Sequence, residues 1–391
     1  MNESKGCSTV APLQPPVLHL RALSDGPNYI ALAVPFFFLL IAIELVVAWR
    51  RHKRTHEFAD TISDLGCGIT QRVTLLFFEG LLLLAYVALY EHRFVDLGRH
   101  PVVAWILAFL AVDFAYYWWH RASHRINFLW AAHVVHHQSE EYNLAVALRQ
   151  GVLTPITNLP FSLPLALVGV PPLVWGTALA LNTLYQFWIH TQLVGPLGPA
   201  EAVMNTPSHH RVHHARNAGY LDRNYAAVFI IWDRLFGTFA PERERPTYGI
   251  TKPLRSFNSL WAQVQPLAEL GAISRGAPTW RDRLAVWFAP PERSFPWEPP
   301  APAPVEKYAV PVRAPLRRYI LVNFTLATIA TFCLMMWARR FSPAALTAGA
   351  LLILGTLLTL GGLMEGRRWA RALEIGRLAA VAVTLVWYAA S

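Results

Sequence analysis

Residues 101–124 decide the fold: PVVAWILAFLAVDFAYYWW at 101–119 runs directly into HRASH at 120–124. A membrane-spanning helix needs about 20 predominantly apolar residues, and the first part of this stretch has that length and character. Its one charged residue is Asp113, and the histidines begin where the apolar run ends. The stretch therefore predicts a membrane helix that delivers histidine side chains to one face of the bilayer.

Apolar blocks of this kind recur along the chain, which is 54% hydrophobic and 15% charged, whereas soluble domains are about 25% charged. The other blocks are residues 29–49, 66–90, 319–337, 344–364 and 372–390, and two stretches within 152–189 that Pro171 and Pro172 separate. These two stretches predict a hairpin of short helices that spans only part of the bilayer. With seven or eight blocks, the expected fold class is an all-α integral membrane protein, a multi-helix transmembrane bundle with a cytoplasmic histidine-rich helical cap.

The orientation follows from the basic residues beside the helix ends, because cytoplasmic loops carry the excess of Lys and Arg. The first block is followed by RRHKR at 50–54, so that end is predicted to be cytoplasmic. Counting forward places residue 120 and the segment 191–317 on the cytoplasmic side, whereas Arg339 and Arg340 would lie outside, against the rule. Many arginines, few lysines and short loops favour a bacterial inner membrane, with the endoplasmic reticulum as the alternative.

Four regions are expected along the chain. Residues 1–27 form an N-terminal tail, 28–290 a membrane catalytic domain, 291–316 a proline-rich linker, and 317–391 a last group of transmembrane helices without histidine. The net charge of +10 is explained by anionic lipid head groups, so no nucleic-acid partner is predicted. The three cysteines are far apart in sequence and form no CxxC motif, which argues against a thiolate metal site.

Three histidine motifs carry the predicted chemistry: HRASH at 120–124, HVVHH at 133–137 and HRVHH at 210–214. Residues three and four apart share a helix face, so each motif presents its imidazoles together. Eight imidazoles exceed the four ligands of one structural zinc ion, which favours two metals with about four ligands each. His190 is a further predicted ligand, and His209 is an adjacent candidate.

Imidazole suits zinc, copper, iron and nickel, so ligand type alone does not select the metal. HExxH and paired ExxH motifs are absent from the sequence, which disfavours a zincin protease and a carboxylate-bridged di-iron bundle. An all-histidine site at a membrane surface favours iron and dioxygen; a zinc-dependent membrane hydrolase and a metal transporter are the alternatives. Asp113 lies two helical turns before His120, where it would orient a ligand histidine or make a polar contact between helices.

The order of the three motifs between membrane helices resembles the fatty acid hydroxylase/sterol desaturase superfamily. The resemblance covers about residues 30–260 and includes YYWWHRASH, LWAAHVVHHQSEEYNLAVALRQ, LYQFWIHT, NTPSHHRVHHARN and NYAAVFIIWDRLFGTF. These runs are most similar to the branch that cleaves alkylglycerol ether lipids.

The resemblance implies a non-haem di-iron centre that uses O2 to hydroxylate, or alternatively desaturate, a lipid reached laterally from the bilayer. The implied ligands are His120, His124, His133, His136, His137, His190, His210, His213 and His214. Asp113, His190 and Asn205 are the candidate catalytic residues. Further candidates for contacts around the ligands or with the head group are Arg149, Gln150, Arg211, Asn224, Tyr225 and Asp233.

The resemblance also implies a separate electron donor, which is tetrahydrobiopterin or a protein of the cytochrome b5 or ferredoxin type. In the alkylglycerol branch, a glutamate associated with tetrahydrobiopterin use follows the first motif. Arg125 stands at that position here, which counts against dependence on the pterin.

An aromatic set that leads to the first motif, FAYYWW at 114–119, marks the predicted side of lipid access.

Overall fold

The computed structural model describes residues 28–294 and 306–390. The predicted tail and residues 295–305 of the predicted linker lie outside these ranges. Within them the chain is helical and forms no strand, and two isolated β-bridges join Met204 to Phe229 and Ala215 to Tyr248. The all-α fold expected from the sequence is confirmed.

Four of the described helices are long and apolar enough to cross a membrane. They are α2 (Tyr29–Arg50), α5 (Pro101–Arg125), α14 (Ala314–Trp337), which η4 (Ala338–Arg340) extends, and α15 (Pro343–Met364). A fifth span results if α3 (Phe58–Leu75) and α4 (Glu79–Tyr90) are counted together, although a 59° bend separates them. The chain is therefore a membrane protein, with fewer candidate spans than the seven or eight blocks in its sequence.

The block at 66–90 differs from the single helix that its composition suggests. Helix α3 begins at Phe58, before the block, and ends at Leu75, and the chain bends before α4. Most of α3 is buried, and it inserts polar side chains such as Asp60, Asp64 and Gln71 among other helices. At Gly68 the packing is so close that a Cβ atom would lie 2.3 Å from the carbonyl oxygen of Leu148. Packing of α3 against other helices of the protein therefore determines the path of residues 58–90.

The predicted hairpin of short helices is confirmed as α7 (Thr154–Val168) and α8 (Pro172–Trp188). Gly169 ends α7 in the left-handed region, with φ +97°, a conformation that favours glycine. Pro172 then begins α8, where its missing N–H removes no helical hydrogen bond. The hairpin returns the chain to the end of α5 that carries the first histidine motif.

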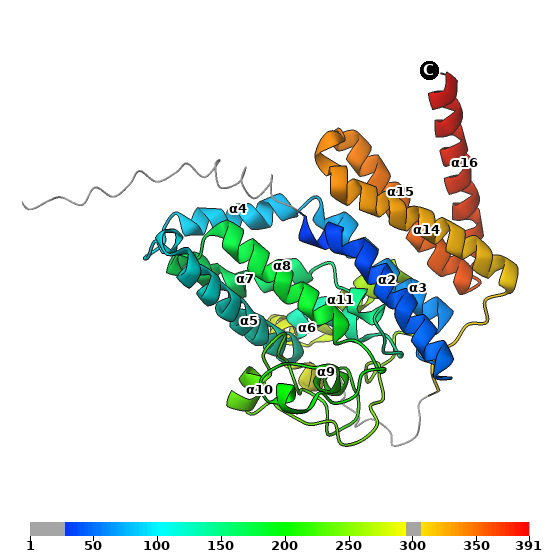
Figure 1. The fold of residues 1–391 in the computed structure, drawn as a ribbon. Coiled ribbons are helices and arrows are strands. Elements are labelled where there is room, and N and C mark those ends of the chain that lie inside the picture. Colours follow the sequence, from blue (N-terminus) through cyan, green and yellow to red (C-terminus); the bar gives the residue numbers. More distant parts are fainter. Residues whose placement is uncertain (1–27, 295–305, 391) are drawn as a thin grey trace, which may run out of the picture.

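Figure 1 shows α5, α7 and α8 side by side, with α14, α15 and α16 (Arg368–Ala390) on the other side of the molecule. The first set buries an apolar core that includes Ala104, Ala108 and Val112 of α5; small side chains of this kind let helices approach closely. Of the second set, α14 and α15 share a core with α2 and α3. The other α-helices of the described residues are α6 (Asn127–His137), α9 (Pro207–His213), α10 (Ile231–Leu235), α11 (Ser259–Gly276), α12 (Trp280–Phe288) and α13 (Pro291–Ser294).

Arg149 joins the second histidine motif to the membrane helices. Its side chain is 2% exposed and its partners are Ser63 Oγ at 3.0 Å, Asp64 Oδ1 at 3.1 Å, Val135 O at 2.7 Å and Gln138 Oε1 at 3.0 Å. Its own carbonyl oxygen accepts a hydrogen bond from His136 Nδ1. A buried charge persists only when it is paired and hydrogen-bonded, and this guanidinium meets that condition by fixing α6 against α3.

Removal of this guanidinium would leave Asp64 as an uncompensated buried charge. We therefore expect Arg149→Met to lower the free energy of unfolding by about 3–5 kcal/mol. Thermal unfolding of the purified protein in detergent, followed by tryptophan fluorescence, measures the change. Arg243→Met, at an exposed position, is the matched control, and equal midpoints for the two variants would contradict this role.

Candidate metal centre

The three histidine motifs and His190 meet at one end of α5. Nine buried imidazoles form two groups, and within each group the candidate ligand nitrogens lie within 4.8 Å of one another. The five-histidine group consists of His120, His124, His133, His137 and His213. The four-histidine group consists of His136, His190, His210 and His214. The structure thus brings together every histidine that the sequence analysis assigned as a ligand.

Each of the last two motifs is divided between the groups. On α6, His133 and His137 are one turn apart and join the five-histidine group, whereas His136 points to the other group. At α9 the division is reversed, because His210 and His214 share the four-histidine group and His213 belongs to the other. The two helices therefore interleave their side chains, and neither group can form from one motif alone.

Contacts between imidazole nitrogens show that the groups fit metal ions. His133 Nε2 lies 2.9 Å from His120 Nε2 and 3.1 Å from His137 Nε2. In the other group, His190 Nε2 lies 3.2 Å from His136 Nε2 and 3.0 Å from His210 Nε2. Two nitrogens that bind the same metal ion, each at about 2.1 Å, stand roughly 3 Å apart. This distance matches the measured separations.

Backbone carbonyl groups fix the tautomer of four of these histidines. The Nδ1 atoms of His120, His136, His190 and His213 lie 2.7, 2.8, 2.7 and 2.9 Å from the carbonyl oxygens of Tyr225, Arg149, Gln186 and Arg223. A neutral imidazole that donates from Nδ1 keeps the lone pair of Nε2 for a metal, which is the usual arrangement around metal-bound histidine. The ring orientation is thus set before any ion binds.

Several other ring nitrogens are buried without a hydrogen-bond partner, among them Nε2 of His124, His213 and His214. Burial and the neighbouring imidazoles hold the pKa of His137, His213 and His214 well below the ordinary value. The rings are therefore neutral, as metal ligands must be. Unpaired buried nitrogens are costly in a closed interior, and two metal ions would satisfy Nε2 of His124, His213 and His214.

Asp222 is a residue of this site that sequence reasoning missed. Its Oδ1 lies 3.6 Å from His124 Nδ1, and its Oδ2 accepts a 2.7 Å hydrogen bond from Arg125. Burial raises the pKa of Asp222, but His124 and Arg125 outweigh this effect and hold it below the ordinary value. Arg125 also pairs with Glu292 at 2.8 Å. No sequence motif indicates Asp222. It lies in a loop, and the helical spacing that predicted the histidines gives no information about a loop residue.

The carboxylate of Asp113 contacts no histidine, in contrast to the ligand-orienting contact that was predicted. It accepts hydrogen bonds from Asn182 Nδ2 and the Val228 N–H at 2.8 Å, from the Phe229 N–H at 3.1 Å and from Trp232 Nε1 at 2.8 Å. These bonds tie α5 to α8, to the segment before α10 and to α10 itself. Asp113 is thus placed as a polar link between helices, the other role considered for it.

Asn205 and Asp233 shape the loop that supplies the carbonyl partners. Asn205 Nδ2 donates to the carbonyl oxygens of Ala226 at 2.6 Å and Ala227 at 3.2 Å, and Asp233 accepts from the N–H groups of Tyr225 and Ala226 at 2.8 Å each. Carbonyl groups of the same loop hold His120 and His213, so the hydrogen bonds of Asn205 connect it to these histidines only through the backbone. Asn224 contributes to the same loop by donating to Ala240 O at 2.7 Å.

Other candidates lie outside the groups. The ring of His209 is buried and packs edge-on against Phe239, away from both groups. Arg211 forms a two-point ion pair with Glu242, at 2.9 and 2.6 Å, and Gln150 donates to Ala147 O. These contacts support the surrounding structure and do not reach the ligand nitrogens.

Comparisons with known proteins agree with this geometry. The model of the Fatty acid hydroxylase family matches residues 105–238. Human alkylglycerol monooxygenase is 36% identical over 93% of this chain and 83% of its own length. The zebrafish (Danio rerio) alkylglycerol monooxygenase is 46% identical over 61% of this chain and 54% of its own. An ornithine lipid hydroxylase of Rhizobium tropici is 28% identical over 40% of this chain and 49% of its own.

No solved structure matches the chain. The family-model match spans the three histidine motifs, and the human relative extends the similarity across almost the whole chain. The chain therefore belongs to the fatty acid hydroxylase family, together with the alkylglycerol monooxygenases.

Proposed function

We propose that this membrane protein is a non-haem di-iron oxygenase that hydroxylates a C–H bond of a lipid with O2. The observation that carries the proposal is the pair of buried, neutral histidine groups at the end of a candidate membrane span. Relatives named alkylglycerol monooxygenase support an alkylglycerol ether as the substrate.

The proposed iron ligands are the members of the two histidine groups. When bound, the iron pair would supply the oxidising power that an unactivated C–H bond requires. Because the ligands are neutral, they leave the charge of the metal ions uncompensated and the centre electrophilic. Asp113 and Asn205 are proposed as positioning residues, since both fix the loop whose carbonyl groups orient His120 and His213.

The proposed reaction needs a reductant. One oxygen atom of O2 enters the C–H bond to give the alcohol, and the other leaves as water after uptake of two electrons and two protons. On an ether carbon the alcohol is a hemiacetal, which separates into an aldehyde and glycerol. We propose that a separate donor, tetrahydrobiopterin or a cytochrome b5- or ferredoxin-type protein, supplies the electrons.

We propose that the histidine groups face the cytoplasm, in a bacterial inner membrane or, in a eukaryote, the endoplasmic reticulum. The basic end of α2 lies beside this site, because Arg51 donates to the carbonyl oxygen of Leu193 at 3.1 Å, close to His190. Basic residues mark the cytoplasmic end of a span. In this proposal residues 28–290 form the catalytic domain, residues 317–391 the C-terminal transmembrane helices, and α14 and α15 support α2 and α3 through their shared core.

Removal of half of one histidine group tests the metal assignment. We expect His190→Ala/His214→Ala to lower bound iron from two ions per chain to about one, because two remaining imidazoles are fewer than the three ligands of a catalytic site. Elemental analysis of iron-loaded protein gives the stoichiometry. His209→Ala, outside both groups, should retain both ions. Stoichiometric zinc with no dependence of activity on iron would count against the proposal.

Isotope labelling separates an oxygenase from a hydrolase. We expect purified protein, supplied with iron, a reductant and an alkylglycerol, to give products that contain one 18O atom from 18O2 before any exchange with water. Reduction traps the aldehyde as an alcohol that keeps the oxygen atom, and the mass of this alcohol shows whether the label is present. Formation of the fatty alcohol and glycerol in anaerobic samples, before any reduction step, would instead indicate a zinc-dependent hydrolase, because hydrolysis of an ether requires no oxidant.

Asp222 and Glu292 offer a matched pair for the carboxylate beside His124, since both contact Arg125 but only Asp222 lies near a histidine. We expect Asp222→Asn to weaken metal binding by about 10–100-fold, as loss of a partner behind a ligand usually does. The Glu292→Gln variant should bind the metal with the same affinity as the unchanged protein. Metal titration in competition with a chelator measures both, and equal affinities would contradict the role of Asp222.

A further inference from the structure

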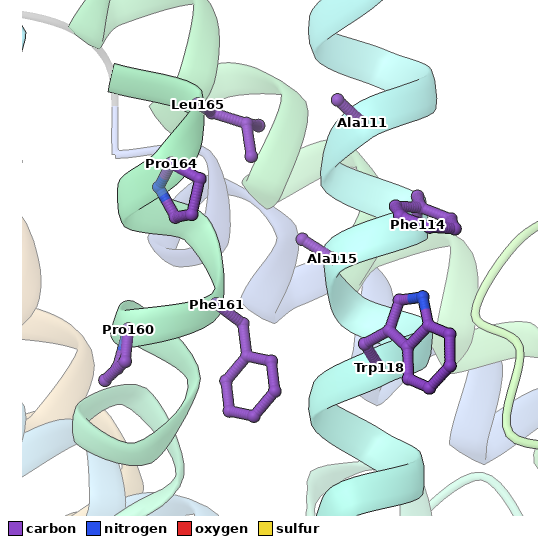
Figure 2. A pocket seen from close by; sticks show the side chains of 8 residues that line it. All are labelled: Ala111, Phe114, Ala115, Trp118, Pro160, Phe161, Pro164 and Leu165. Carbon is purple, nitrogen blue, oxygen red and sulfur yellow. The ribbon is translucent and has the colours of Figure 1, made fainter. Parts of the chain in front are cut away.

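An apolar groove runs between α5 and α7 and has a volume of about 440 Å³. Figure 2 shows its walls, with the side chains of α5 on one side and those of α7 on the other. The lining residues are Ala111, Phe114, Ala115, Trp118, Pro160, Phe161, Pro164 and Leu165. Because no charged or hydrogen-bonding side chain other than an indole lines the groove, its chemistry fits a hydrocarbon.

The groove opens toward the outside of a candidate membrane span. Its α5 residues follow one another at i, i+3, i+4 and i+7, so they share one helix face. Phe114 and Trp118 of this face are 38% and 36% exposed. In α7, Pro160 and Pro164 are inside the helix, where proline removes backbone hydrogen bonds and bends the axis. When α5 spans the bilayer, the open side of the groove faces lipid chains.

One end of the groove lies next to the five-histidine group. Trp118 lines the groove, and the neighbouring Trp119 stacks on His120 with 5.8 Å between ring centroids and meets His133 edge-on at 5.3 Å. Trp119 Nε1 also donates to Thr157 Oγ1 of α7 at 3.3 Å. The two walls of the groove are therefore joined at this end, directly before the histidines.

We propose that this groove binds the alkyl chain of the lipid substrate, with the carbon to be oxidised nearest Trp119 and the rest of the chain extending toward Ala111. The inference rests on the proposed function for the identity of the chain as substrate. A helix rises 1.5 Å per residue, so the lining from Ala111 to Trp118 extends about 10 Å along α5. The groove thus extends along α5 from the bilayer interior toward the histidine groups and ends at Trp118, with Trp119 between its end and His120.

A single lipid chain fits this site better than a partner helix. A spanning helix needs about 20 residues of length, whereas the concave part covers about two turns of α5. The volume of 440 Å³ lies within the range of about 300–1,000 Å³ that is typical of small-molecule sites. In a bilayer, moreover, hydrocarbon chains always surround the open side.

Photo-crosslinking tests the occupant. The probe is a hexadecyl glycerol ether with a diazirine in its chain, mixed with iron-free full-length protein in phosphatidylcholine vesicles. Mass spectrometry of the digested protein is expected to find the label concentrated on residues 111–118 and 160–165, and excess unlabelled ether should compete it away. Ala115→Phe fills the groove and should lower this labelling about ten-fold, the effect of about two methylene groups losing their apolar contacts.

Ile106→Phe is the matched control, because Ile106 is on the same helix, is 57% exposed and does not line the groove. The Ile106→Phe variant should be labelled in the groove to the same extent as the unchanged protein. If Ala115→Phe does not fold, Ala111→Phe at the half-buried end of the groove replaces it. Label spread evenly over the exposed faces of α2, α5 and α14, or labelling that neither groove variant reduces, would overturn the proposal.

The experiment keeps this inference separate from the proposed oxygenation, since it uses neither iron nor O2. Labelling of the groove in a protein that incorporates no 18O would uphold the lipid site and contradict the oxygenase. Incorporation of 18O without competed labelling of the groove would do the reverse. A crosslink between two copies of the chain at residues 111–118 would also overturn the proposal.

Discussion

Nine buried imidazoles need partners for their ring nitrogens, and the folding of the histidine-bearing end of the molecule depends on this requirement. For His120, His136, His190 and His213 the partner of Nδ1 is a backbone carbonyl oxygen. The Nε2 atoms then converge in two groups that only interleaved α6 and α9 can form. Because each carbonyl group belongs to a segment outside the histidine motifs, those segments must be held as firmly as the ligands.

Buried polar side chains hold these segments. Arg149 fixes α6 to α3 and presents its own carbonyl oxygen to His136. Asp233 accepts hydrogen bonds from N–H groups at the start of residues 225–229, and Asp113 accepts them from N–H groups at the end. Asn205 donates to carbonyl groups between these two points. A polar network in a low-dielectric interior is stable only when it is fully satisfied. Disturbance of any of these side chains would therefore reach the histidines through the backbone.

Much of this architecture was predictable because it depends on local sequence. The length of apolar blocks predicted α2, α5, α14 and α15, the double proline predicted the α7–α8 hairpin, and helical spacing predicted which histidines gather. The division of each later motif between two groups was not predictable, because it depends on how α6 and α9 pack. The same limit applies to Asp113, whose partners are on α8 and near α10, and to Asp222, which a loop brings to His124. The bend between α3 and α4 also results from tertiary packing.

The central claim is that imidazole nitrogens of both groups hold the metal ions. X-ray absorption at the iron K-edge, on protein loaded with iron and freed of unbound metal, tests it most directly. The account predicts a nearest shell dominated by nitrogen at about 2.0–2.2 Å, with the outer scattering pattern of imidazole rings. A nearest shell made mainly of carboxylate oxygen or of sulfur, or protein that retains no iron, would contradict it.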